Sequence, residues 1–362
     1  MDRLLLRRRA FVPRRPFVKE RGRRRPVFCG VRDCPRLYRG DFIGNYKIAS
    51  RYHLDAMRCA KEADHPLALA HCYLLRGIHD YMVGDWHAAL INYKQSASTY
   101  WAIGNLRYWG SAICLSFIAL RSKGDAEWIA LGKELLRVAG ETHDQQLHGW
   151  ARLVTARVYT HHGAYEAAVV DFEKAARLLE LVPDYLNVAN TLAELAVCDL
   201  RQGHLDRALG SADRSGQLIK DHRLVGMLVT RPIMVRAEVY LFAAEQTSGE
   251  ERKARLKVAA KACKVAAKQG KTVRDDGAPD GLRLCGIYAW ITGDRKKAQR
   301  LWNQSISVAE TLGARYVLAQ TNFEIGKRLN SRRHLVLAEA LFMETGAQAD
   351  LSNTQQLLRD SA

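Results

Sequence analysis

The best candidate for chemistry in this sequence is a short stretch similar to the end of a phosphate-binding loop, Gly270-Lys271-Thr272. In such loops backbone N–H groups cradle a phosphate and the lysine neutralises it, which requires another glycine five residues before the first. Val265 occupies that position, and the stretch follows an expected helix instead of a strand. We therefore expect an exposed loop between two structural units, and no nucleotide site.

Four histidines near residue 160 are the other candidates. A zinc site needs three or four converging ligands, but His143 and His148 are five residues apart and would not share a helical face. His161 and His162 precede a turn, where histidine interacts favourably with a helix C-terminus. No nucleophile motif accompanies them. We predict no metal site, no cofactor and no enzyme activity.

The elements that would position such residues are set by four glycine turns at a nearly constant spacing. Gly84, Gly124, Gly163 and Gly203 are 40, 39 and 40 residues apart. A period of roughly 20 to 50 residues is typical of stacked-repeat proteins, in which each unit packs on its neighbours and the array presents a long surface. The period therefore favours binding over catalysis.

Small and aromatic residues repeat in phase with these turns and indicate paired antiparallel helices. Small side chains let two helices approach closely, and we expect the aromatic side chains to fill the wider part of the gap. The same template recurs at Gly293, and a further turn at 330–333 follows about one period later. Alanine comes five residues after the glycine at Ala89, Ala168, Ala208 and Ala298, an aromatic residue nine after it at Tyr93, Phe172 and Trp302, and a second glycine seven before it at Gly77 and Gly286.

The predicted fold is an all-α, right-handed α-solenoid of about seven helical hairpins over residues 39–362. Helices are expected over 67–83 and 86–100 on either side of Gly84, and a capping helix over 348–360. The turn of the first unit is placed either at Gly40 or at Gly44.

One unit in the second half of the array is expected to be irregular. Two periods would leave about ten residues over between Gly203 and Gly293. We place helices near 227–245 and 251–269 and the extra residues in polar stretches, so a break in the array is predicted near 245–281. The Asp275-Asp276 pair is interpreted as part of a solvated turn.

The charge of the chain is concentrated at its start. The whole sequence has a formal net charge of +18, whereas residues 1–40 hold fourteen Lys/Arg and three Asp/Glu. Residues 1–38 contain four prolines, and we predict a disordered basic arm there. It would attract polyanions such as RNA through counterion release; a targeting segment, or no role, are the alternatives. Its arginine clusters are Arg7, Arg8, Arg9, Arg14, Arg15, Arg23, Arg24 and Arg25.

The cysteines and the apolar segments of the sequence bear on the cellular compartment of the protein. The eight cysteines are scattered, with no CxxC pair, and no secretory signal is recognisable. Cysteines used as small hydrophobes are typical of a reducing interior. No apolar run approaches the ~18 residues of a membrane span. We expect a cytoplasmic protein that does not bind membranes.

The repeated residues resemble the tetratricopeptide repeat, in units of about 40 residues. The resemblance covers about residues 40–362. Longer repeats of this kind are typical of the C-terminal region of large bacterial signalling ATPases, including proteins with an adenylate cyclase domain and MalT-like activators. The closing segments 309–316, 323–326 and 338–347 strengthen it. The matching residues are Gly77, Gly84, Trp86, Ala89 and Tyr93 in one unit, Tyr165, Ala168, Phe172 and Ala175 in another, and Gly286, Gly293, Ala298 and Trp302 in a third.

The resemblance implies a concave groove lined by the first helix of each unit. Aromatic residues and arginines are enriched at binding hot spots. A role in the core is the alternative, especially for Leu74, Ile78 and Ile287. Carrying the family's groove positions over gives His71, Leu74, Ile78, Tyr81, Trp150, Leu153, Arg157, Thr160, Asp280, Arg283, Ile287, Trp290, Gln320, Phe323 and Lys327.

These residues lead us to expect a non-catalytic regulatory scaffold that binds a protein or peptide partner in its groove, in bacterial signalling. A MalT-like ligand-sensing regulator of transcription and an RNA- or polyanion-binding protein acting through its arm are the alternatives. The chain is interpreted as a stand-alone repeat protein, a fragment, or the detached repeat region of a cyclase or ATPase. The identity of the partner and the oligomeric state stay open.

Overall fold

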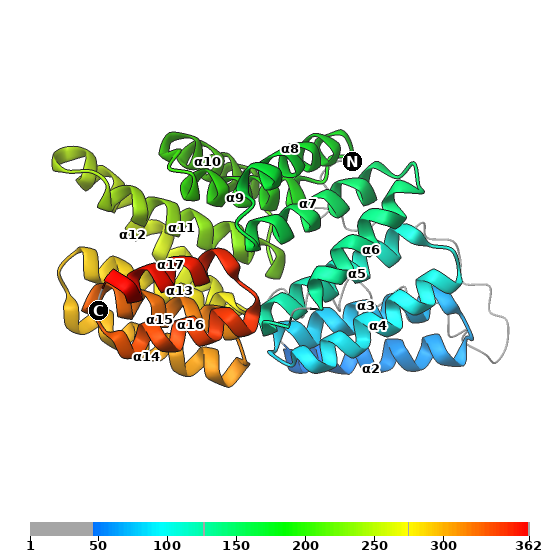
Figure 1. Cartoon of the computed structure of the whole chain (residues 1–362). Coiled ribbons are helices and arrows are strands. Elements are labelled where there is room, and N and C mark those ends of the chain that lie inside the picture. Colours follow the sequence, from blue (N-terminus) through cyan, green and yellow to red (C-terminus); the bar gives the residue numbers. More distant parts are fainter. Residues whose placement is uncertain (1–45, 126, 274, 361–362) are drawn as a thin grey trace.

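The computed structural model describes residues 46–125, 127–273 and 275–360 (Figure 1). Within these ranges the regular elements are all helices. They are α2 (Tyr46–Glu62), α3 (Pro66–Met82), α4 (Trp86–Ala102), α5 (Leu106–Lys123), α6 (Trp128–Gly140), α7 (Gln145–His161), α8 (Tyr165–Leu181), α9 (Tyr185–Arg201), α10 (Leu205–Asp221), η1 (Met227–Val229), α11 (Thr230–Glu245), α12 (Gly249–Thr272), α13 (Gly277–Ile291), α14 (Arg295–Leu312), α15 (Arg315–Leu329), α16 (Arg332–Thr345) and α17 (Gln348–Asp360).

Seven helical hairpins follow one another in the described chain, from α3–α4 to α15–α16, and α17 covers the last of them. The predicted all-α solenoid of about seven hairpins with a capping helix is therefore confirmed, and α17 spans 348–360 as expected. The two candidate turns at Gly40 and Gly44 lie outside the described residues. No described helix is both long enough and apolar enough to span a bilayer.

The turns between paired helices have a common local cause. Their glycines take a positive φ, 90° at Gly84 and 91° at Gly293, a region of backbone conformation that glycine enters without steric cost. At the last hairpin Asn330 takes this role, with φ 50°. The aspartate after Gly84 then starts the next helix, since the Asp85 Oδ1 accepts a hydrogen bond from the Ala88 N–H at 3.0 Å.

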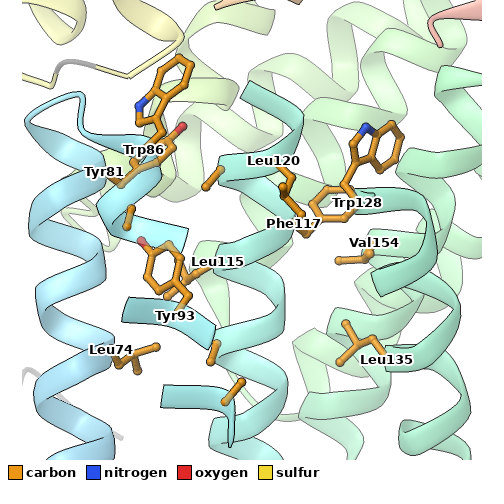
Figure 2. Packing of buried hydrophobic residues seen from close by; sticks show 14 of the residues in the cluster. Leu74, Tyr81, Trp86, Tyr93, Leu115, Phe117, Leu120, Trp128, Leu135 and Val154 are labelled. Carbon is orange, nitrogen blue, oxygen red and sulfur yellow. The ribbon is translucent and has the colours of Figure 1, made fainter. Parts of the chain in front are cut away.

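Each pair of helices packs at the small and aromatic residues of the repeat. Gly77 and Gly286 are points of closest approach: a Cβ atom at Gly77 would lie 2.5 Å from the Tyr93 ring, and one at Gly286 would lie 2.3 Å from the Trp302 indole nitrogen. Tyr93 and Trp302 are fully buried. Figure 2 shows this packing in the first hairpins, where Tyr93 lies in a core continuous with α5 and α6.

The irregular unit is α11–α12, and its extra residues lengthen a helix instead of forming a loop. α12 has 24 residues, whereas the other α-helices described have 13 to 18. The expectation of an exposed loop at Gly270 is thus wrong, because Gly270 lies in α12. A Cβ atom at this position would lie only 2.8 Å from the Ala278 Cα, so the two backbones pack closely here. Asp275 is also not solvated: it is 2% exposed, and its carboxylate accepts a hydrogen bond from the Gly277 N–H.

The array curves until its two ends meet. The first helices of successive hairpins contact one another, as α5 does α7 and α9 does α11, so they form the inner face and the second helices lie outside. In the last units α15 contacts α5 and α17 contacts α7. Figure 1 shows the C-terminal hairpins, in orange and red, beside the α5 helix near the start of the array.

Because the Trp302 ring fills the space that a Cβ at Gly286 would need, Gly286→Ala should destabilise the protein. Overpacking of a core costs typically 1–3 kcal/mol, so the midpoint of urea denaturation should fall. Gly210→Ala is the matched control, because Gly210 is an exposed helical glycine with open space around it. That variant should gain up to about 1 kcal/mol from helix propensity. An equal or higher midpoint for Gly286→Ala would contradict this packing.

Candidate functional site

The place where the ends of the array meet is held by polar contacts between residues far apart in sequence. We call this contact of α15–α17 with α5, α7 and α9 the seam. The His161 Nε2 donates a hydrogen bond to the Thr345 carbonyl at 3.0 Å. Asp350 on α17 accepts one from the Tyr316 hydroxyl at 2.7 Å and pairs with Arg201 at 3.1 Å. The C-terminal hairpin is therefore fastened to the middle of the chain.

A pocket lies inside the seam and encloses about 50 Å³. A second, more open pocket of about 400 Å³ adjoins it, and the two share Tyr165, Arg201 and Ala349. The walls of the inner pocket come from both halves of the array, α5 to α11 on one side and α15 to α17 on the other. Its polar lining consists mainly of Arg121, Arg157, Arg201, Arg231, Glu194, Glu238 and Asp350, with Trp128, Tyr165 and Tyr316 among the aromatic residues.

The centre of the pocket wall is a single carboxylate shared by three arginines. Glu194, on α9, is only 2% exposed. The Arg157 Nε donates to it at 3.0 Å, and Arg231 reaches its two oxygens through Nε and Nη2 at 3.4 Å each. Arg121 lies 3.7 Å away. Glu194 thus connects α5, α7, α9 and α11 on the inner face.

These arginines decide the protonation of Glu194. Burial alone would raise the pKa of its carboxyl, but Arg231, Arg157 and Arg121 lower the pKa to about 2. The arginines also repel one another. Burial lowers the pKa of Arg157, and the nearby Arg121 and Arg231 lower it further, whereas Glu194 raises it. The carboxylate is ionised and the site around it is rich in positive charge.

The network continues along the inner face towards the C-terminal units. The Arg283 guanidinium pairs with Asp280 at 2.7 Å and lies 3.9 Å from Glu238. Further on, Arg328 binds both oxygens of Glu245 at 2.7 and 3.0 Å. Charges buried in this way require partners of opposite charge. Each first helix from α9 to α15 supplies at least one charged side chain to this network.

Among the groove residues expected from the sequence, three line the inner pocket: Arg157, Thr160 and Gln320. Trp290 and Phe323 are half-buried. The Trp290 ring lies beneath the Arg295 guanidinium at 3.4 Å, and the Phe323 ring packs against Phe342. Lys327 is exposed. Binding of a partner by these side chains stays a prediction.

Several other expected groove residues have structural partners or belong to the core. Leu74 and Tyr81 are 5% and 2% exposed and lie in the core of the first hairpins (Figure 2), because successive first helices contact one another along this side. His71 packs against the rings of Tyr100 and Tyr108. The remaining members are Leu153, Asp280, Arg283 and Ile287, which are buried, Ile78, which is half-buried, and Trp150, which donates a hydrogen bond to Asp184.

Sequence reasoning missed most of the seam pocket. Glu194 was detectable, since it interrupts an otherwise largely apolar stretch, and all of Val188–Asp199 is buried. A carboxylate in such surroundings needs a partner. Arg121, Arg201 and Arg231 fall at helix positions that also suit an exposed arginine, and Asp350 lies in the capping helix. Nothing local marks these residues as neighbours.

His161 lies between the Trp128 and Tyr316 rings at the seam. Within the described ranges, no group of three or more His, Cys, Asp or Glu side chains has the arrangement of a metal site. The eight arm arginines, from Arg7 to Arg25, lie outside the described residues, so their binding of polyanions stays a prediction.

Comparison with known proteins places the fold. No family model matches the sequence, and no curated protein matches it. The structure is similar to that of the apo form of RapI, with a TM-score of 0.52 and 12% identity over 76% of this chain and 98% of that one. It is also similar to a Rap protein complexed with Competence and Sporulation Factor, with a TM-score of 0.63 and 11% identity over 93% and 87% of the two chains.

The class is therefore that of helical-repeat proteins with a TPR-like solenoid fold. In the described part of this chain the array closes at the seam, where three arginines surround Glu194. At such low identity the likeness to the Rap structures concerns the fold alone. The narrower resemblance to cyclase-associated and MalT-like repeats rests on sequence texture and gains no support from these structures.

Glu194→Gln should destabilise the protein in a pH-dependent way. The pKa of Glu194 falls from 4.5 to about 2 on folding, so its stabilisation is present above pH 4.5 and is lost as the pH falls towards 2. At pH 7 the free energy of unfolding of the wild type should exceed that of the variant by about 3 kcal/mol. At pH 3 this difference should be smaller by about 2 kcal/mol. Urea denaturation measures it, with the exposed Glu310→Gln as control. A difference independent of pH would contradict the assignment.

Asp350→Ala should loosen the seam, because it removes the acceptor of the Tyr316 hydroxyl and the ion partner of Arg201. Hydrogen bonds to charged groups contribute about 1.5–3 kcal/mol. Amide hydrogen exchange in α16 and α17 should accelerate accordingly. Asp360→Ala, at the exposed end of α17, should leave exchange in α16 unchanged. If Asp350→Ala leaves the exchange rates at their wild-type values, these contacts do not hold the seam.

Proposed function

We propose that this protein is a non-catalytic regulatory scaffold that binds a peptide or protein partner on the inner face of its solenoid, at the seam. The observation that carries the proposal is that helices from distant parts of the array form the walls of one pocket. An occupant would touch α5 to α11 on one side and α15 to α17 on the other. Binding would therefore favour the closed form of the array over an open one, as a ligand shifts any equilibrium towards the state that it binds better.

The chemistry of the pocket supports a binding role. Its charged side chains are engaged in ion pairs, such as Arg157 with Glu194 and Arg201 with Asp350. Paired groups of this kind orient and select a partner, and arginine and aromatic side chains are frequent hot spots. The role therefore rests on recognition, with no catalytic step assigned to these residues.

One of the similar structures supports a binding role by analogy. It is a Rap protein complexed with Competence and Sporulation Factor. A fold of this kind can therefore hold such a factor, and we extend a binding role to this chain as part of the proposal. We extend the proposal to a place in bacterial signalling and in the cytoplasm. A link to cyclase or MalT-like proteins would rest on the sequence of the repeats alone.

The proposal is tested by selecting linear peptides from a display library on the full chain and measuring the affinity of the best binder. Ala349→Trp would fill space that the two pockets share, and it should weaken binding at least tenfold, which corresponds to about 1.4 kcal/mol. Ala167→Trp, at an exposed position of α8, is the matched control and should bind as the wild type does. Equal affinity of the wild type and Ala349→Trp would contradict a site at the seam.

A further inference from the structure

We propose that the seam pocket binds a carboxylate of the partner, either the C-terminal carboxylate of a peptide or the side chain of an aspartate or glutamate. This inference rests on the proposed function and deepens it, because it assigns the chemistry that the pocket selects. Three observations carry it: the balance of charge, the hydrogen-bond donors that are left over, and the size of the two adjoining spaces.

The charge balance of the pocket favours an anion. Four arginines line it, Arg121, Arg157, Arg201 and Arg231, against three carboxylates, Glu194, Glu238 and Asp350. The excess is greatest around Glu194, which is the acid shared by three of these arginines. Asp350 is engaged with Arg201 and Tyr316. Glu238 lies 3.9 Å from Arg283 and is also close enough to attract Arg201 and Arg231. A further negative group would complete the set.

The arginines also retain donors for such a group. A guanidinium carries five N–H donors, whereas the Arg121 Nη1 lies 3.7 Å from Glu194, beyond the length of a normal hydrogen bond. Arg231 uses its Nε and one Nη on Glu194. The side chains of Arg121 and Arg231 are 22% and 26% exposed, whereas that of Arg157 is 9% exposed. Of the three arginines around Glu194, Arg121 and Arg231 are thus the two that a ligand reaches.

The geometry of a guanidinium suits a planar carboxylate, which can accept two parallel hydrogen bonds. The pocket wall also contains Trp128, Tyr165 and Tyr316. Aromatic surfaces exclude water, and a charge-assisted hydrogen bond is stronger where water is excluded. The pocket therefore offers a site in which one carboxylate is bound more strongly than it would be on an open surface.

The available volume limits the ligand to one small group at this point. Sites for whole small molecules enclose roughly 300–1,000 Å³, whereas the inner pocket encloses about 50 Å³. A carboxylate, with three heavy atoms, fits a space of that size. The adjoining pocket of about 400 Å³ shares Tyr165, Arg201 and Ala349 with the inner one. It has room for the rest of a peptide whose acidic group occupies the inner pocket.

The test uses two pools of randomised, N-acetylated hexapeptides that are identical except at the C-terminus, where one carries a free carboxylate and the other an amide. Each pool is passed over the immobilised full chain at 0.15 M ionic strength, where exposed charges are largely screened. Retained peptides are then identified by mass spectrometry. We expect retention to favour either the free-carboxylate pool or peptides with Asp or Glu, by at least tenfold. The first outcome identifies a terminal carboxylate and the second a side chain.

Variants locate the interaction. Arg121→Gln should abolish the preference for acidic peptides, and Arg121→Lys, which keeps the charge without the planar fork, should retain part of it. Arg137→Gln is the control, because Arg137 lies on α6 outside the pocket, is 53% exposed and pairs with Glu134 and Glu141. It should behave as the wild type. Thermal denaturation confirms that each variant is folded.

The outcomes separate this inference from the proposed function. Retention of peptides with no preference for an acidic group, or a preference that survives Arg121→Gln in folded protein, would overturn the carboxylate site but leave a peptide scaffold. Retention of no peptide by the wild type would contradict both. Binding of a ten-nucleotide single-stranded DNA that is lost in Arg121→Gln would identify a nucleic acid as the ligand and overturn the inference.

Discussion

A helical hairpin buries only part of its apolar surface by itself, and the rest of this structure depends on covering the remainder with the neighbouring hairpin. The central helix α9 shows the constraint most clearly, because every residue of Val188–Asp199 is buried among α8, α10 and α11. Close approach at Gly77 and Gly286, with Tyr93 and Trp302 opposite, sets how the helices of each pair lie. The array is therefore built from contacts between neighbours.

The same stacking places the first helices on the inner face and curves the array until its ends meet. That curvature brings polar groups from five or more helices into one region with little solvent. A charge there is stable only with a partner, which explains why Glu194 collects Arg121, Arg157 and Arg231 and why Asp350 is shared by Arg201 and Tyr316. The charged network is thus a consequence of closure as well as a device that holds it.

A pocket whose walls belong to both ends of an array couples what it binds to the shape of the whole chain. The inner pocket meets this condition, because α17 supplies Asp350 and Ala349 while α5, near the start of the array, supplies Arg121. A partner bound there would act on the separation of the ends without any large change within a hairpin. This is the physical basis on which we propose a regulatory scaffold, and it needs no reactive group.

The sequence by itself determined the repeat, the hairpin turns at Gly84, Gly163 and Gly293, and the capping helix over 348–360, because these follow from local preferences and short-range packing with a fixed period. It misplaced the extra residues of α12, since a polar surface helix and a polar loop have similar composition, and it assigned Leu74 and Tyr81 to a groove although they lie in the core. Only the tertiary structure decided the seam and its pocket. Arg121, Glu194 and Asp350 are separated by 73 and 156 residues, and their proximity results from the accumulated rotation of all the units between them, which no local pattern encodes.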